Sequence, residues 1–175
     1  MPHGELYIRT KRTITAHNNA QALHTGMADL TVNNATYKGW VDAYDRYGLS
    51  LEDGALGKLM APAPNKKPVG NNNVMMNGVA YLGGTIGVKD ERSLSLDVHI
   101  MAASKPAFLS QYGLLCSEVL DAGYIQVRTS YQPDVIYHLI YQDCQQYSQY
   151  ARSMAKFTLA FIEPHPEYRI HKQSM

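Results

Sequence analysis

An acid and a histidine stand two residues apart in the stretch RSLSLDVHI, at Asp97 and His99. In an active site such a pair can exchange protons, but it needs a third group and a pocket. No serine or cysteine nucleophile motif accompanies the pair. A spacing of two is also the period of a β-strand, which places both side chains on one polar face. We interpret the pair as the solvated face of a strand, or as part of a contact between subunits.

Other chemically competent residues do not form a recognisable site. The seven histidines include no H-x-x-x-H or H-E-x-x-H motif and no pairing with cysteine at zinc spacing. The glycines of 83–87 lack both the lysine of a P-loop and the spacing of a dinucleotide-binding fingerprint. Asp42 and Asp45 lie near Tyr44 and Tyr47 and could bind a sugar or a cation, but we interpret them as the face of a solvated loop. We therefore assign no catalytic, cofactor-binding or metal-binding residues and do not expect an enzyme, although an unrecognised active site stays an alternative.

Composition narrows the class of protein. A chain of 175 residues with 45% hydrophobic and 18% charged residues is typical of one folded domain. A net charge of +1 disfavours a strongly basic nucleic-acid binder or adsorption to an anionic membrane. No apolar run is long enough for a transmembrane helix, and the N-terminus does not resemble a signal peptide. Two cysteines, Cys116 and Cys144, are too few for a disulfide framework, and we expect both to be reduced.

The aromatic residues are dominated by tyrosine, with 13 tyrosines against one tryptophan and three phenylalanines. Tyrosine favours strands, and it is also enriched where subunits meet. Composition alone does not separate a β-rich fold from an extensive subunit interface.

The pattern is most regular after residue 90. Apolar residues alternate over 94–100 and again over 154–162, as in half-buried strands, and further strands are predicted over 124–128 and 135–143. Ser104 and Pro106 begin a helix over 104–121, and Gly123 follows its end. The apolar stripe of this helix comprises Phe108, Tyr112, Leu115, Cys116 and Val119, widened by Leu109 and Leu120. The sequence predicts a mainly β fold with one principal helix (α+β), whose sheet is mostly antiparallel.

The N-terminal half is less regular. Strands are predicted over 5–15 and 36–47, and the Ser50-Leu-Glu-Asp53 stretch resembles a capping box that opens a short helix through Leu59 or Met60. The segment 61–78, APAPNKKPVGNNNVMMNG, is rich in proline, asparagine and glycine and predicts a long loop or arm. Residues 18–36 are similarly polar. Two such excursions suggest surfaces that reach toward neighbouring subunits.

Three stretches of the C-terminal half resemble one protein family. They are DERSLSLDVHIMAASKPAFLSQYGLLCSEVLDAGYIQVRT, YQPDVIYHLIYQDCQQY and AKFTLAFIEPHP. In this order they resemble the ring-forming tail proteins of long-tailed bacteriophages, of the distal-tail and tail-tube type. The stretch GWVDAYDRYGLSLEDGALGKLMAPAP is similar to phage proteins more generally. The resemblance implies a single tail tube-like domain over 1–175, an antiparallel β-sandwich or barrel with an extended arm at 61–78.

The resemblance also implies a function. The chain would be a structural virion protein, a distal tail, tube or baseplate component, without a cofactor or membrane anchor. Six copies would form a homohexameric ring around a channel through which DNA passes without sequence-specific binding, next to other tail proteins. Assembly would take place in the cytoplasm of the bacterial host. The alternative is a carbohydrate- or receptor-binding module of the tail tip, suggested by the tyrosines and Trp40.

Overall fold

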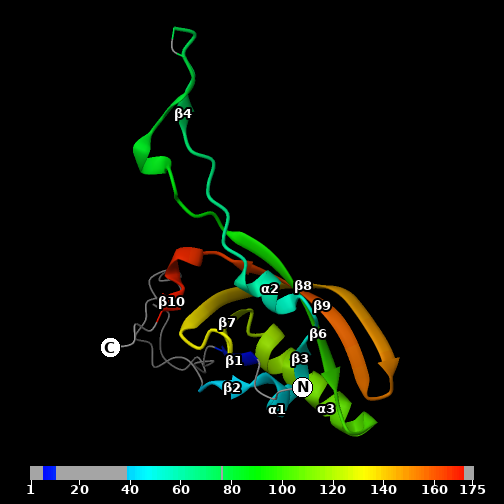
Figure 1. Cartoon of the computed structure of the whole chain (residues 1–175). Helices are drawn as coiled ribbons and strands as arrows, with labels where there is room; N and C mark the ends of the chain where they lie inside the picture. Colours follow the sequence, from blue (N-terminus) through cyan, green and yellow to red (C-terminus); the bar gives the residue numbers. More distant parts are fainter. Residues whose placement is uncertain (1–5, 11–38, 76, 172–175) are drawn as a thin grey trace, which may run out of the picture.

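The computed structural model of the chain describes residues 6–10, 39–75 and 77–171. Its main element is an antiparallel sheet with the order β2-β1-β7-β8-β9-β6-β3, and β10 pairs with the beginning of β8 (Figure 1). The strands are β1 (Leu6–Thr10), β2 (Val41–Asp42), β3 (Leu49–Leu51), β6 (Arg92–Met101), β7 (Tyr124–Thr129), β8 (Val135–Ala151), β9 (Met154–Glu163) and β10 (Ile170–His171). The predicted mainly antiparallel fold with one principal helix is confirmed.

The centre of the core lies on one face of the paired strands β6 and β9. Leu94, Leu96, Val98 and Ile100 of β6 are buried, and each lies opposite a buried apolar residue of β9. Directly opposed residues of antiparallel strands point to the same face of the sheet, so the two rows form one continuous apolar surface. The alternation predicted for both strands is confirmed.

The principal helix α3 (Lys105–Leu115) covers this apolar surface. Its N-cap is Ser104, whose hydroxyl oxygen accepts a hydrogen bond from the backbone N–H of Ala107. The helix continues as a π-turn over Cys116–Leu120, and Gly123 then adopts a left-handed conformation with φ of 70°. The prediction was wrong for Leu109, which is 56% exposed, because it lies about 100° around the helix from buried Phe108.

The region predicted as a strand over 36–47 is mostly helical where the structure describes it. Only Val41 and Asp42 form a strand, and α1 (Ala43–Tyr47) follows. The Asp42 carboxylate accepts hydrogen bonds from the N–H groups of Tyr44 and Asp45, which caps the helix. Gly48 ends it with φ of 65°. Asp42 and Asp45 therefore belong to a short capped helix rather than to a loop.

Two more boundaries differ from the sequence prediction. Ser50 lies in β3 and caps nothing, since α2 (Ala55–Met60) begins after Gly54. β8 extends to Ala151 rather than to residue 143, with register shifts against β9 after Tyr141, Cys144 and Gln149. At each shift β8 has one residue more than β9, so the side chains beyond the shift again point to the same face of the sheet as their partners in β9. The irregular spacing hides the period of two in the sequence. The predicted strand over 5–15 coincides with β1 over 6–10, and its remainder lies outside the described residues.

Candidate assembly surface

The chain leaves the sheet after α2 and returns at β6, and the segment between them forms an arm over 62–90 that projects far from the body (Figure 1). Its two legs run antiparallel. The N–H of Lys66 donates to the carbonyl of Val88 at 2.8 Å, and the N–H of Leu82 donates to the carbonyl of Val69 at 2.9 Å. Farther out, β4 (Gly70–Asn71) pairs with β5 (Ala80–Tyr81). The turn Gly83–Thr85 interrupts the returning leg, and Gly87, in the same glycine-rich stretch, has φ of 79°.

The arm has no core of its own. Every described residue from 69 to 84 is exposed, and at the tip Val74 and Met75 are 103% and 93% exposed. The other exposed large apolar residues of the arm are Val69, Val79, Tyr81, Leu82, Ile86 and Val88. The arm holds three of the chain's 16 lysines and arginines and one of its 15 acidic residues, Asp90, which leaves 13 basic and 14 acidic residues, a net charge of −1, in the rest of the chain. The arm is apolar, positively charged and unpacked.

A buried arginine fixes the base of the arm. The guanidinium of Arg92 donates hydrogen bonds to the carbonyls of Leu59 at 3.0 Å, of Lys58 at 3.3 Å and of Ala61. These carbonyls belong to the last turn of α2 and its C-cap, where helices lack internal donors and carry partial negative charge. The Arg92 side chain is only 7% exposed. It therefore ties the point where the arm begins to the strand at which the arm ends.

The same guanidinium belongs to a buried charge cluster. Its Nη2 lies 2.7 Å from Oε2 of Glu163, which is fully buried, and Arg169 binds both oxygens of this carboxylate at 2.7 Å. The ring of Tyr137 lies under the Arg169 guanidinium at 4.9 Å. Burial lowers the pKa of Arg92, whereas the hydrogen bonds to Glu163 raise the pKa of Arg169. One carboxylate thus links the base of the arm to the C-terminal segment after β9.

Sequence reasoning missed this cluster, although a signal was present. Arg92 stands two residues before Leu94 and Glu163 two residues after Phe161, so the alternation of each strand places the charge on the inner face. The two residues are cross-strand partners in the register of β6 and β9. Opposite charges at paired inward positions predict a buried ion pair.

The body of the protein has an open strand edge. Beyond Tyr141, β8 pairs only with β9 among the described residues, because the pairing with β7 reaches no farther than Ile140, opposite Tyr124, the first residue of β7. Along its other side, the backbone of residues 142–151 forms no ladder with any strand of residues 6–10, 39–75 or 77–171. Most of its exposed side chains are polar, and glutamine is the commonest among them; the exposed residues are Gln142, Asp143, Gln145, Gln146, Tyr147, Gln149 and Ala151. The other long outer strand, β6, is covered instead, by β3 and by contacts with α2.

Asp97 and His99 lie on one polar face of β6, which other residues of the chain partly cover. Residues 52–58 lie against it: the Lys58 ammonium lies 2.5 Å from the Asp97 carboxylate, and Glu52 lies 2.8 Å from Nδ1 of His99. Thr158 donates to Asp97 at 2.6 Å. The hydrogen bond from Lys58 is the main reason that the pKa of Asp97 lies below its usual value. The Asp97 and His99 side chains are 27% and 14% exposed, so the face is partly solvated, as interpreted, and its charges pair within their own chain. A contact of this face with another subunit stays a prediction.

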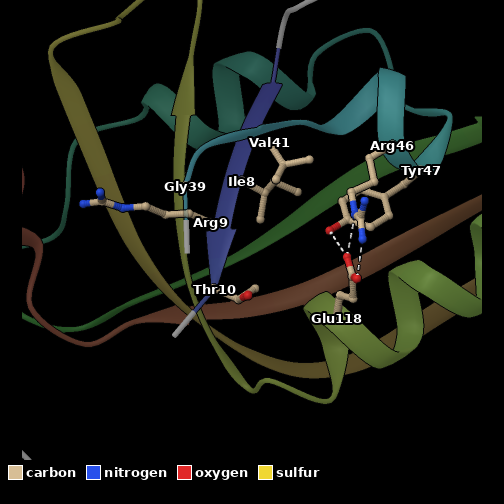
Figure 2. Close-up of a pocket in the computed structure, with 8 residues that line it drawn as sticks. All are labelled: Ile8, Arg9, Thr10, Gly39, Val41, Arg46, Tyr47 and Glu118. Atoms are coloured by element: carbon tan, nitrogen blue, oxygen red, sulfur yellow. Dashed lines mark hydrogen bonds and ion pairs between the residues drawn. The ribbon is translucent and has the colours of Figure 1, made fainter. Parts of the chain in front are cut away.

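Figure 2 shows a small pocket between β1, α1 and the π-turn after α3. Its acidic group is Glu118, which accepts two hydrogen bonds from Arg46, at 2.7 and 2.5 Å, and one from Tyr47 at 2.9 Å. Burial, followed by the bond to Glu118, raises the pKa of Tyr47 to about 12. A carboxylate held by an arginine and a phenol is poorly suited to exchange protons with a substrate. The pocket is a structural contact between helix and sheet.

Neither Trp40 nor the potential metal ligands of the described residues form a binding site. The ring of Trp40, on which a sugar would stack, already carries the guanidinium groups of Arg9 at 4.5 Å and Arg128 at 4.7 Å. Among the residues that the structure describes, no group of three or more histidines, cysteines and acids is placed to hold a metal ion. Within the same ranges, no helix has the length and hydrophobicity to cross a bilayer.

Comparison with known proteins gives a similarity of structure but none of sequence family. No protein-family model matches the chain. No curated protein matches it either. Among solved structures, the chain is similar to the crystal structure of SPP1 Dit (gp 19.1), described as a paradigm of the hub adsorption apparatus in phages that infect Gram-positive bacteria. The TM-score is 0.48 and the sequence identity 13%, over 72% of this chain and 47% of that chain. The matched region thus spans about half the length of the SPP1 protein.

Proposed function

We propose that this chain is a structural subunit of a phage tail, a distal tail or tube protein whose copies join into a closed ring around a DNA channel. The observation that carries the proposal is the arm, which exposes apolar side chains that it cannot bury against itself. The resemblance of residues 90–164 to ring-forming tail proteins gives the assembly its class and its expected number of six copies. The subunit would be built into the virion after synthesis in the host cytoplasm.

The arm is suited to contact another copy of the same chain. It is unusual for a monomer to expose so many large apolar side chains on one segment, and such a segment is typical of an interaction surface. Its lysines, Lys66, Lys67 and Lys89, favour a negatively charged partner, and the rest of the chain is net negative. Because arm and acceptor are different surfaces, the contact is head-to-tail, and such contacts close into rings when the rotation between copies allows it.

The open edge of β8 supplies a second contact. Pairing of residues 142–151 with a strand of a neighbouring copy would satisfy the backbone groups that β9 leaves unpaired. Extended between copies, the sheets would form a continuous inner surface. A near-neutral chain lining that channel lets DNA pass without tight binding.

We also propose that the subunit has no catalytic role. Three acids in candidate sites, Asp97, Glu118 and Glu163, are each held by a cation of the same chain. Such carboxylates stabilise the fold. A monomer that bound glycans would favour the receptor-binding alternative instead.

The proposal is tested with an arm deletion designed from the structure. The N–H of Lys66 lies 2.8 Å from the carbonyl of Val88, so residues 67–87 can be replaced by a two-glycine link without moving the base. A milder variant carries Val74→Ser and Met75→Ser. Its matched control is Leu109→Ser, which removes an exposed apolar side chain from α3 instead.

The oligomeric state is then measured by size-exclusion chromatography with light scattering, and rings are counted by negative-stain electron microscopy. We expect rings for the full chain and for Leu109→Ser, and folded monomers for the deletion and for the double variant. A full chain that stays monomeric at high concentration contradicts ring formation. Rings that survive the deletion show that the arm is not the contact.

A further inference from the structure

The two cysteines are partly buried and come from different elements, Cys116 from the π-turn that continues α3 and Cys144 from β8. Tyr112 of α3 packs against the cross-strand pair of Tyr147 in β8 and Phe157 in β9, with ring centroids 6.0 and 6.3 Å away. The rings of this pair stack on each other at 6.0 Å. This contact fixes the position of the middle of α3 over the sheet.

One step further along, helix and strand each present a cysteine. Cys116 follows Tyr112 by four residues, so it lies on the same side of the helix, about 6 Å farther along the axis. On β8 the next inward residue from Tyr147 is Cys144, opposite buried Leu159. The register shift between these rungs makes the step about 7 Å. The two displacements therefore match in length.

The step from Tyr112 to Cys116 along the helix also has the same direction as the step from Tyr147 to Cys144 along β8. The helix starts beside the end of β6 at Met101, which pairs with Met154 at the beginning of β9. It runs from there toward β1, which its final π-turn contacts. Along β8 this is the direction from Tyr147 to Cys144. Tyr112 and then Cys116 thus pass over successive rungs of the same strand.

Both cysteines are free thiols and partly exposed, so a small molecule can reach them. The Cys144 thiol donates to the carbonyl of Gln146 at 3.4 Å. Burial is the main cause that raises the pKa of Cys144, and the nearby Asp143 and Cys116 add to it. A raised pKa keeps the Cys144 thiol mostly protonated, which slows its attack on a disulfide.

We propose that Cys116 and Cys144 are an oxidation site, at which a low-molecular-weight disulfide such as oxidised glutathione converts the thiol pair into an intramolecular disulfide. One cysteine, as thiolate, attacks the glutathione disulfide and releases one reduced glutathione. The other cysteine attacks the mixed disulfide and releases the second. The pair loses two electrons and two protons, which two molecules of glutathione carry away. The bond ties α3 to the part of β8 whose outer edge is open.

The consequence depends on the compartment. In a reducing cytoplasm the chain keeps both thiols, and the crosslink forms once it meets an oxidising medium. The inference does not depend on ring formation, because both cysteines belong to one chain. A failure of the crosslink and a failure of assembly are therefore separate results.

The test uses the full chain, incubated at low protein concentration with oxidised glutathione and then analysed by thiol titration and by mass spectrometry of non-reduced peptides. We expect loss of both thiols, a peptide linked through Cys116 and Cys144, and a melting temperature raised by about 10 °C. Reductant should restore the original melting temperature. Cys116→Ser and Cys144→Ser should each stop at a mixed disulfide without the rise.

The wild-type chain alone can overturn the proposal. Two thiols that persist after oxidation, a product that stops at mixed disulfides with glutathione, or crosslinks only between chains would each show that the sulfur atoms do not meet. Because these results come from the unaltered protein, they do not depend on whether the serine variants fold.

Discussion

Replacing Arg92 with methionine tests the idea that a buried guanidinium holds the base of the arm. The substitution keeps the length of the side chain and removes its charge and donors. The carbonyls of Leu59 and Ala61 lose their donor, whereas Glu163 keeps the two bonds from Arg169. Breaking a buried ion pair by removing one partner costs about 3–5 kcal/mol, and the carboxylate that stays paired favours the lower end, about 3 kcal/mol. For a chain of this length, the expected fall in melting temperature is roughly 9 °C.

The measurement is urea unfolding of the full chain, followed by circular dichroism, together with amide exchange at the start of the arm. The matched control is Arg46→Met. Arg46 also pairs with a glutamate, but its side chain is 44% exposed, so its loss should cost less than about 1 kcal/mol. Glu163→Ala should cost more than Arg92→Met, because it leaves two buried cations without a counter-charge. The reasoning is refuted if Arg92→Met costs no more than Arg46→Met, or if exchange at the base of the arm is unchanged.

Three further predictions concern separate features. The pKa of Asp97 is depressed, so its contribution to stability is present above its unfolded pKa and is lost as the pH falls through its folded pKa. Asp97→Asn should lower stability by less than about 1 kcal/mol at pH 7, because Lys58 is half exposed. Urea unfolding should show this difference shrinking once the pH falls below about 4, the unfolded pKa, and vanishing only below the folded pKa. A Cβ at Gly70 would lie 2.6 Å from Val79, so Gly70→Ala should open the β4–β5 hairpin and speed amide exchange at Leu82 without changing global stability. The control is Gly84→Ala, whose Cβ meets nothing within 4 Å and which should leave this exchange unchanged. Lysines in place of Gln142 and Gln149 should block assembly through the open edge of β8 while the melting temperature stays within about 2 °C, and light scattering that still finds rings would exclude this edge as an interface.

The elements after residue 90 could be predicted because their patterns are local. In β6 and β9 the apolar alternation coincides with the buried positions, and Ser104 marks the start of α3 by a hydrogen bond that spans three residues. The end of β8 could not be predicted in this way. Its register shifts break the period of two. Tyr141, Cys144 and Tyr147 stand three residues apart, although each lies opposite a buried residue of β9 and so points to the same face of the sheet.

The contacts of the candidate surface depend on tertiary structure. Nothing local in the sequence indicates that residues 52–58 lie against Asp97 and His99, since that contact forms only when α2 packs on β6. The capping-box interpretation failed for a similar reason: Ser50 and Leu51 are held in β3 by pairing with β6. Strand pairing across long sequence distances outweighed the local preference for a helix start.

The same irregular strand bears on how unassembled copies avoid aggregation. A long, flat and apolar edge would recruit strands from any partly unfolded protein in a crowded solution and grow into fibrils. The exposed half of β8 is bent by its register shifts and lined by glutamines and an aspartate rather than by aliphatic residues. A passing strand with regular spacing cannot stay in register along it for more than a few residues. If copies assemble through this edge as proposed, the same register shifts would both limit aggregation beforehand and restrict which strand can pair there.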